Sequence, residues 1–287
     1  MKLCTLYRDN GHEGVGLVTD HGVIDVAAAS ESSGIPAPIT MLDVIQGGDL
    51  AIQQLQQIQK AATAAIDESV VRFAPVIPHP GKILCVGLNY RKHALESNMP
   101  IPSAPVYFAK FANSLAAHRE SIQLPAVVEQ CDYEVELVAV IGRKTRNVNP
   151  QQALASVFGY AVGNDLSARD LQFRSSQWLY GKAIDGFSPL GPYLVTADDI
   201  ADPQDLPLKC WVNGELRQDS TTADMIFSVA DVISDLSRIM TLEPGDVIYT
   251  GTPEGVAMGM AEKVWLRPGD EIVCEVGHLG RLQNRIV

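Results

Sequence analysis

The chain has 287 residues, of which 46% are hydrophobic and 20% charged, and its formal net charge is −12. This composition allows a substantial core, in one large domain or in a large and a small one. The negative charge argues against nucleic acid or an anionic membrane as the main partner, although a local cation could still attract a small anionic substrate. There is no run of 18 apolar residues and no signal-peptide pattern, and the five cysteines are widely spaced. We therefore expect a cytoplasmic protein with reduced thiols and no membrane span.

The N-terminal part of the chain predicts a small α+β unit. Residues 1–28 contain two short apolar runs around an Asp-His-Gly turn, a pattern that predicts a β-hairpin. Residues 40–66 carry apolar side chains at three- and four-residue spacings and predict a helix, which Asp43 could cap. A proline-rich stretch then marks a boundary, so we expect domains at 1–75 and 76–287.

The rest of the chain predicts mostly strands. Strands without regularly alternating helices argue against a Rossmann or TIM-barrel layout, and favour a large β-rich domain with mixed strand pairing. The predicted strands are Lys82–Gly87, Val106–Ala109, Glu134–Ile141, Ser156–Gly163, Tyr193–Thr196, Leu208–Val212, Asp246–Thr250 and Glu271–Val276, and the predicted helices are Pro150–Ala155, Ala168–Phe173 and Val229–Met240.

Two glutamates stand within one of these apolar strands. Side chains alternate between the faces of a strand, so Glu134 and Glu136 point the same way, about 7 Å apart. Burying unpaired carboxylates is costly, and two on one face repel each other. A hard cation such as Mg²⁺ or Mn²⁺ would resolve both problems, which indicates a metal site and an enzyme. The alternative is a solvated strand face.

A third carboxylate follows the next predicted strand. Asp165 comes directly after an apolar run, where it could reach the same metal ion or could serve as an ordinary turn residue. Ser167 and Asp170 have the spacing of a capping box and predict that a helix opens after Asp165.

Further polar residues could supply catalytic groups. Lys182 lies among apolar and aromatic residues, so it either extends to water or opposes a developing oxyanion. His93 and Glu96 are three residues apart and would be neighbours on a helical turn, as a general-base pair or as a surface salt link. Residues 251–255 form a glycine-rich turn that could present amides and a hydroxyl to a substrate carboxylate.

Six short motifs occur between residues 80 and 287. They are Asn89-Tyr90-x-x-His93-x-x-Glu96, Tyr133-Glu134-x-Glu136-Leu137, Gly163-Asn164-Asp165-x-Ser167-Ala168-Arg169-Asp170-x-Gln172, Gly181-Lys182, Val212-Asn213-Gly214-Glu215 and Thr250-Gly251-Thr252-Pro253-x-Gly255-Val256. In this order they resemble the fumarylacetoacetate hydrolase superfamily. The resemblance implies a mixed β-roll or β-sandwich catalytic domain, commonly dimeric, with a small N-terminal α+β domain in many members.

The resemblance also implies roles for individual residues. One departure stands after the lysine, where members often have Ser-Phe-Asp-Thr and this chain has Ala-Ile-Asp-Gly, ending at Gly186. The missing threonine hydroxyl puts the polar contacts around the lysine in question. The implied roles are Mg²⁺ or Mn²⁺ ligation by Glu134, Glu136 and Asp165, catalysis by Lys182 with the dyad His93 and Glu96 on a mobile lid helix, and substrate contacts by Arg169, Gln172, Thr252, Gly251 and Tyr90.

These residues predict divalent-metal-dependent cleavage of C–C bonds in short 2-oxo or β-diketo acids. The reaction would be hydrolysis of an acylpyruvate, decarboxylation of oxaloacetate, or both, through an enolate that the metal and Lys182 stabilise. His93, oriented by Glu96, would activate the water for hydrolysis. Two alternatives stay open: an isomerase or hydratase of unsaturated 2-oxo dicarboxylates, and a non-catalytic protein that binds metal and oxo acids. In each case we expect a homodimer.

Overall fold

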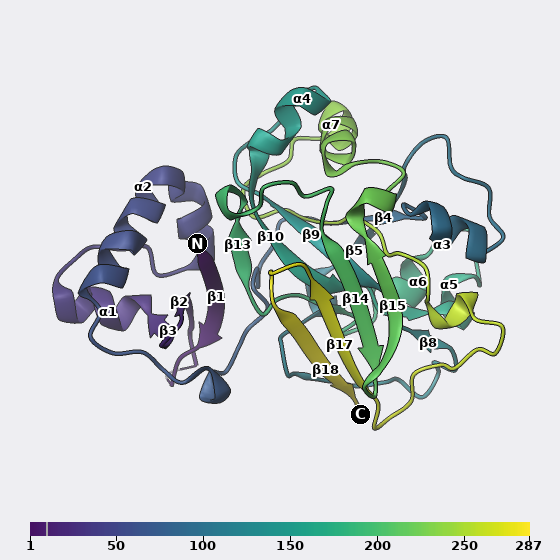
Figure 1. Cartoon of the computed structure of the whole chain (residues 1–287), viewed down its shortest axis with the longest axis horizontal. Coiled ribbons are helices and arrows are strands. Elements are labelled where there is room, and N and C mark those ends of the chain that lie inside the picture. The colour runs from purple at the N-terminus through teal and green to yellow at the C-terminus, as the bar shows by residue number, and fades with distance from the viewer. Residues whose placement is uncertain (10) are drawn as a thin grey trace.

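The computed structural model describes residues 1–9 and 11–287. Figure 1 shows a smaller N-terminal part, built of helices and strands, beside a larger strand-rich body. The elements confirm the predicted β-rich α+β class. None of the helices in the described ranges combines the length and the apolar character that a membrane crossing requires.

The N-terminal part contains the predicted hairpin and one more strand. β2 (Glu13–Thr19) pairs with β3 (Gly22–Asp25), and β1 (Lys2–Tyr7), which we did not predict, pairs with the other edge of β2. Helix α1 (Val26–Ser33) follows, and α2 (Met41–Ala61) occupies most of the range 40–66 in which a helix was predicted, with a kink at Gly48, whose φ of 52° is not helical. The Thr40 side chain caps α2 by accepting from the amide of Asp43, so the prediction that Asp43 is the cap was wrong.

One nine-stranded sheet runs through the molecule in the order β3-β2-β1-β13-β10-β9-β16-β4-β5. β1 pairs antiparallel with β13, so the sheet and an apolar cluster continue from the N-terminal part into the body. The division at residue 75 therefore stays a prediction. The body strands of this sheet are β4 (Ile83–Gly87), β5 (Val106–Lys110), β9 (Val135–Ile141), β10 (Val157–Asn164), β13 (Leu194–Thr196) and β16 (Val247–Tyr249).

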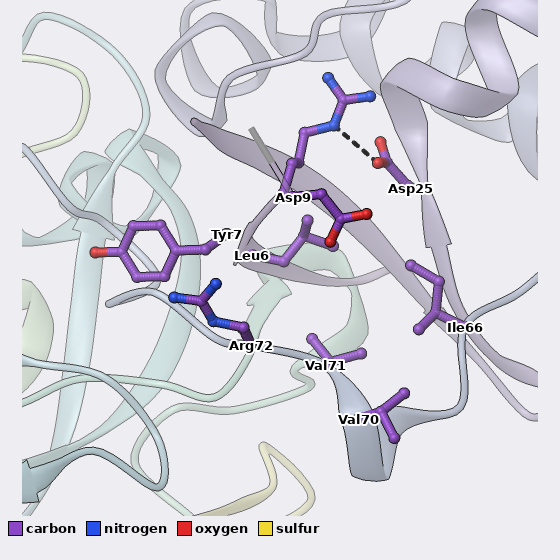
Figure 2. Close-up of a pocket in the computed structure, with 9 residues that line it drawn as sticks. Leu6, Tyr7, Asp9, Asp25, Ile66, Val70, Val71 and Arg72 are labelled. Carbon is purple, nitrogen blue, oxygen red and sulfur yellow. Dashed lines mark hydrogen bonds and ion pairs between the residues drawn. The ribbon is translucent and has the colours of Figure 1, made fainter. Parts of the chain in front are cut away.

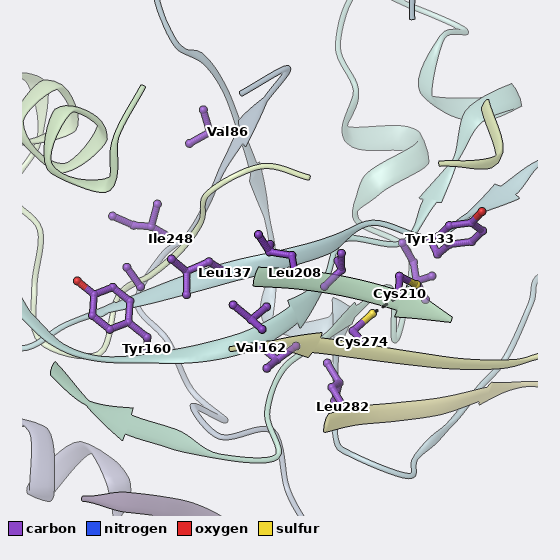
Figure 3. Close-up of a cluster of buried hydrophobic side chains, with 14 of the residues drawn as sticks. Val86, Tyr133, Leu137, Tyr160, Val162, Leu208, Cys210, Ile248, Cys274 and Leu282 are labelled. Atoms are coloured by element: carbon purple, nitrogen blue, oxygen red, sulfur yellow. Dashed lines mark hydrogen bonds between the residues drawn. The ribbon is translucent and has the colours of Figure 1, made fainter. Parts of the chain in front are cut away.

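A second sheet packs against the first. It has five strands in the order β15-β14-β17-β18-β7. Figure 3 shows side chains such as Leu137 and Val162 of the large sheet meeting Leu208 and Leu282 of the small one. Burying this apolar surface is the main contribution to the stability of the body. The strands of this sheet are β7 (Ser121–Ile122), β14 (Pro207–Val212), β15 (Glu215–Thr221), β17 (Glu271–Val276) and β18 (Arg281–Ile286).

Short strands, helices and 3₁₀ turns make up the rest of the body. The capping box predicted at Ser167 and Asp170 is wrong, because the Ser167 hydroxyl donates to the Asp165 carbonyl and Asp170 accepts from the amides of residues 129 and 130. The short strands are β6 (Leu115–Ala116), β8 (Cys131–Asp132), β11 (Ser167–Ala168) and β12 (Ser188–Pro189). The helices are α3 (Arg91–Glu96), α4 (Pro150–Ala153), α5 (Arg169–Gln172), α6 (Leu179–Lys182) and α7 (Val229–Ile239), and the 3₁₀ turns are Glu68–Val70, Ala112–Ser114, Leu154–Ser156, Ala197–Asp199, Thr222–Asp224 and Ala257–Gly259.

A groove of about 520 Å³ opens on the N-terminal part. Figure 2 shows Tyr7, Asp9, Asp25 and Arg72 around this groove. Arg8 also lines the groove, and its Nε lies 2.9 Å from Asp25 Oδ2. Its walls include none of the residues that the sequence analysis selected, so the candidate site lies elsewhere.

Candidate active site

Most of the predicted site residues line a small cavity of about 30 Å³. It lies where the ends of β4, β9 and β10 meet the short helices α3, α5 and α6. Half of its wall is apolar or aromatic, including Phe108 and Trp178. The predicted residues in its wall are His93, Glu134, Glu136, Asp165, Arg169, Gln172, Lys182 and Thr252.

Pairing of β9 with β10 brings the three predicted carboxylates together. Glu136 lies opposite Gly163 in the antiparallel register, and the Asp165 amide donates to the Glu134 carbonyl at 2.9 Å. One oxygen from each of Glu134, Glu136 and Asp165 lies within 4.8 Å of the others. The three residues are 4%, 2% and 0% exposed, so neither the solvated strand face nor a simple turn aspartate describes them.

Basic side chains occupy the oxygens of two of these carboxylates. Lys182 Nζ lies 2.7 Å from Glu134 Oε2 and 2.7 Å from Asp165 Oδ2. Arg169 Nη2 lies 2.6 Å from the other oxygen of Glu134, and Lys110 Nζ lies 2.6 Å from the other oxygen of Asp165. Lys182 is 2% exposed, which rules out the alternative in which it extends to water.

Glu136 has a different electrostatic environment. Burial raises its pKa well above the ordinary value, and the charges of Asp165 and Glu134 raise it further. Burial acts the same way on Glu134, but Lys182 and Arg169 outweigh it and hold the pKa of that carboxyl below its usual range. Glu136 accepts from the Gly251 amide at 2.7 Å, and no lysine or arginine pairs with it in residues 1–9 and 11–287. A cation bound beside Glu136 would stabilise its ionised form.

The predicted dyad forms on α3. His93 Nδ1 and Glu96 Oε1 are 2.8 Å apart, and Glu96 Oε2 accepts from the Gly255 amide at 2.9 Å. His93 is 4% exposed and lies in the cavity wall, so the pair is not a surface salt link. Since Glu96 occupies Nδ1, His93 Nε2 is the ring nitrogen left for exchanging a proton with a ligand.

The predicted substrate contacts divide into two groups. Arg169, Gln172 and Thr252 are in the cavity wall, and Arg169 Nη1 donates to Gln172 Oε1 at 3.0 Å. Tyr90 and Gly251 are not in that wall. Tyr90 is fully buried in the hydrophobic core, and Gly251 uses its amide to hold Glu136. The structure thus brings three of the five residues together.

Lys110 and Asp132 are two residues that the sequence analysis missed. Lys110 ends β5 and also donates to the Phe187 carbonyl at 2.7 Å. Asp132 pairs with Arg169 Nε at 2.9 Å and accepts from the amides of Ala257 and Met258. The available signals were a lysine at the end of an apolar strand and an aspartate two residues before Glu134. Through these ion pairs Lys110 orients Asp165, and Asp132 orients Arg169.

The segment after Lys182, which includes Gly186, is held by hydrogen bonds to Asn113. Asn113 donates to the Ala183 carbonyl and to Asp185 Oδ1, and its own carbonyl accepts from the Gly186 amide. Gly186 has a φ of 75°, a left-handed conformation that glycine adopts without strain. The Gly186 departure therefore coincides with a turn that favours glycine, and Asn113 supplies the polar contacts.

A β-rich fold with buried carboxylates, lysine and a histidine dyad in one cavity defines a class of acid–base enzyme with a candidate cation site. The profile of the "Fumarylacetoacetate (FAA) hydrolase C-terminal" family matches residues 82–287. The chain belongs to this family.

Similar proteins carry names of oxo-acid enzymes. The chain is 40% identical over 282 residues to "Oxaloacetate tautomerase Fahd2a, mitochondrial" of Rattus norvegicus, covering 98% of this chain and 89% of that protein. The solved fumarylacetoacetate hydrolase of Exiguobacterium antarcticum has a TM-score of 0.82 at 35% identity, covering 100% and 99%. The fumarylpyruvate hydrolase of Pseudomonas aeruginosa, solved with Mn²⁺ and pyruvate, has a TM-score of 0.66 at 37% identity, covering 72% and 89%. These names support the prediction of an enzyme.

Proposed function

We propose that Glu134, Glu136 and Asp165 hold Mg²⁺ or Mn²⁺. The donor set consists of carboxylate oxygens, which these hard cations prefer. The three oxygens lie close together in a buried site, and the raised pKa of Glu136 marks a carboxyl group whose ionised form its surroundings do not stabilise. Together these observations meet the requirements of a divalent ion better than those of a purely structural ion-pair network.

We further propose that the chain catalyses the keto–enol tautomerisation of a short 2-oxo acid, with oxaloacetate as the substrate. A bound divalent ion would polarise the C2 carbonyl and so acidify the C3 hydrogens. His93 Nε2 takes a proton from C3, the electron pair of that C–H bond forms the C2–C3 double bond, and the π electrons of the C2 carbonyl move to its oxygen. Lys182 lies close enough to the triad to stabilise that oxygen. Protonation of the oxygen gives the enol, and the reverse steps give the ketone.

The main support for this proposal is that the buried base His93 and the carboxylate triad line the same small cavity. This arrangement supplies proton transfer beside a polarised carbonyl, the step that tautomerisation needs and that C–C cleavage shares. The similarity over 98% of the chain to an oxaloacetate tautomerase supports placing tautomerisation ahead of cleavage. The cavity of about 30 Å³ is too small for oxaloacetate, so part of the wall has to move for entry. We propose that the helix α3, which carries the base, is the part that moves.

The test follows the ultraviolet absorbance of enol-oxaloacetate as it converts to the ketone. We expect catalytic amounts of the protein to accelerate the conversion with Mg²⁺ or Mn²⁺, and we expect excess EDTA or His93→Asn to remove the acceleration. A protein that binds Mn²⁺ and oxaloacetate tightly without accelerating the conversion would instead be the non-catalytic binding protein.

Hydrolysis of acylpyruvates is the second candidate. It is supported by the similarity to the fumarylpyruvate hydrolase, whose structure contains Mn²⁺ and pyruvate. In this reaction His93 would remove a proton from water instead of from carbon, and the water oxygen would bond to the distal carbonyl carbon. The C–C bond would then break, its electrons forming the enolate of pyruvate, and the distal part would leave as a carboxylic acid. Pyruvate release from acetylpyruvate, with Mg²⁺ and again with excess EDTA, distinguishes this reaction from tautomerisation. Pyruvate release from oxaloacetate, measured under the same two conditions, tests for decarboxylation.

We also propose a homodimer. Several apolar side chains beside α5 and α6 are exposed, and they surround a groove of about 600 Å³. Exposed apolar patches of this kind commonly mark protein interfaces. Sedimentation equilibrium should give about twice the chain mass of 31.0 kDa, and a monomer at every concentration would contradict the proposal. The exposed side chains are Phe111 (54%), Val127 (60%), Leu179 (45%) and Tyr180 (57%).

A further inference from the structure

Lys182 lies between two of the carboxylates that we propose as metal ligands. Its ammonium nitrogen is 2.7 Å from an oxygen of Glu134 and 2.7 Å from an oxygen of Asp165. Within the described residues, this nitrogen otherwise faces only the ring of Phe108, whose centroid is 5.0 Å away. The hydrogen bonds of the ammonium thus go to the proposed ligands.

We propose that Lys182 is an internal cation that competes with the divalent metal for Glu134 and Asp165. This inference rests on the metal site proposed above. A metal ion about 2.1 Å from the same oxygens would lie within roughly 5 Å of the ammonium nitrogen. Like charges at that separation repel strongly in a buried site. Lys182 therefore stabilises the metal-free protein and weakens metal binding.

The two other buried cations do not share this position. Arg169 holds the opposite oxygen of Glu134 and is also paired with Asp132, 2.9 Å away. Lys110 holds the opposite oxygen of Asp165 and also donates to the Phe187 carbonyl. Both therefore keep partners outside the triad when a metal ion enters. Lys182 has no such second anchor among the described residues, so its ion pairs are the ones that metal binding weakens.

This competition links metal loading to substrate binding. Without metal, both proposed ligands hold the ammonium in place. When a divalent ion neutralises them, the attraction between these carboxylates and Lys182 falls, and the ammonium becomes available to an anionic ligand. The order metal first, oxo acid second follows from the shared carboxylates.

The test measures Mn²⁺ affinity by isothermal titration calorimetry for the wild-type protein, Lys182→Met and Lys182→Arg. Methionine removes the charge and keeps a long apolar side chain, while arginine keeps the charge. We expect Lys182→Met to bind Mn²⁺ about tenfold more tightly or better, because the repulsion is gone. Lys182→Arg should stay near the wild-type affinity. Without metal, Lys182→Met should have a lower melting temperature, and Mn²⁺ should raise it more than in the wild type.

Equal or weaker Mn²⁺ binding by Lys182→Met overturns the competition, and so does equal tightening by both variants, because packing would then be the cause. A variant that folds only with metal can be purified with Mn²⁺ and its affinity obtained by competition with a chelator, which decides the same question. If the wild-type protein binds no Mn²⁺, the proposed metal site fails as well. If wild type and Lys182→Met bind it equally, only the competition fails.

Discussion

Asp132→Asn tests how strongly the ion-pair network behind the cavity contributes to stability. Asp132 is fully buried, and each of its carboxylate oxygens accepts two N–H groups. Oδ2 accepts from Arg169 Nε at 2.9 Å and from the Met258 amide at 3.0 Å, and Oδ1 accepts from the amides of Ala257 and Tyr133 at 2.8 and 3.0 Å. In asparagine one of these oxygens is replaced by an NH₂ group, which then faces the two N–H groups that the oxygen had accepted. Arg169 also loses a negatively charged partner.

Breaking a buried ion pair by removing one partner costs about 3–5 kcal/mol. We expect Asp132→Asn to lower the free energy of unfolding by that amount, a large part of the roughly 5–15 kcal/mol that stabilises a typical domain. Urea unfolding followed by tryptophan fluorescence measures the loss. Asp219→Asn is the matched control, because Asp219 is 3.9 Å from Lys209 on the surface and should change stability by no more than about 0.5 kcal/mol. A loss below about 1 kcal/mol in Asp132→Asn would refute the reasoning.

Four further changes test other parts of the account. Glu136→Gln should weaken Mn²⁺ binding in calorimetry about 100-fold or more, since even indirect supports of metal ligands contribute 10–100-fold; unchanged affinity would exclude Glu136 as a ligand. His93→Asn should slow tautomerisation by about 10²–10⁴-fold while Mn²⁺ affinity stays the same, and equal loss of both would point to misfolding. Tyr90→Phe should raise the free energy of unfolding by about 1 kcal/mol without slowing the reaction, because the buried hydroxyl has no hydrogen-bond partner and lies outside the cavity wall. Burial and the nearby Arg119 lower the pKa of His118 from 6.5 to about 4, so the unfolded chain binds a proton more readily than the folded protein between these two pH values. The free energy of unfolding should therefore fall by up to about 3 kcal/mol as the pH drops through this window. Urea unfolding measures this fall, and His118→Asn should remove the part of it that His118 causes.

The sequence predicted the buried strands of the fold better than the exposed ones. β9 and β10 are long apolar runs that are buried on both faces, and their predicted bounds agree with the structure within one residue. β15 has one buried residue among seven, and only two of the six residues of β18 are apolar, so neither shows a continuous apolar run. Their positions depend on pairing with β14 and β17, which a local pattern does not reveal.

The sequence predicted those site residues that are unusual for the segment in which they occur. Glu134 and Glu136 stand out because carboxylates rarely occur inside an apolar strand. Lys110 gave no comparable signal, because its partner Asp165 is 55 residues away and the two meet only through the sheet. The full burial of Tyr90 is likewise a result of tertiary packing, so the motif around it indicated a substrate contact that the structure does not place in the cavity.

The exchange of the C3 hydrogens of oxaloacetate with deuterated water, followed by proton nuclear magnetic resonance, tests the central claim most directly. Tautomerisation through proton transfer by His93 requires exchange at C3, and the proposed metal site requires that this exchange depend on Mg²⁺. The account predicts rapid exchange by the Mg²⁺-loaded protein and only the background rate with EDTA or with Glu136→Gln. Equally fast exchange with EDTA or by Glu136→Gln would contradict the account.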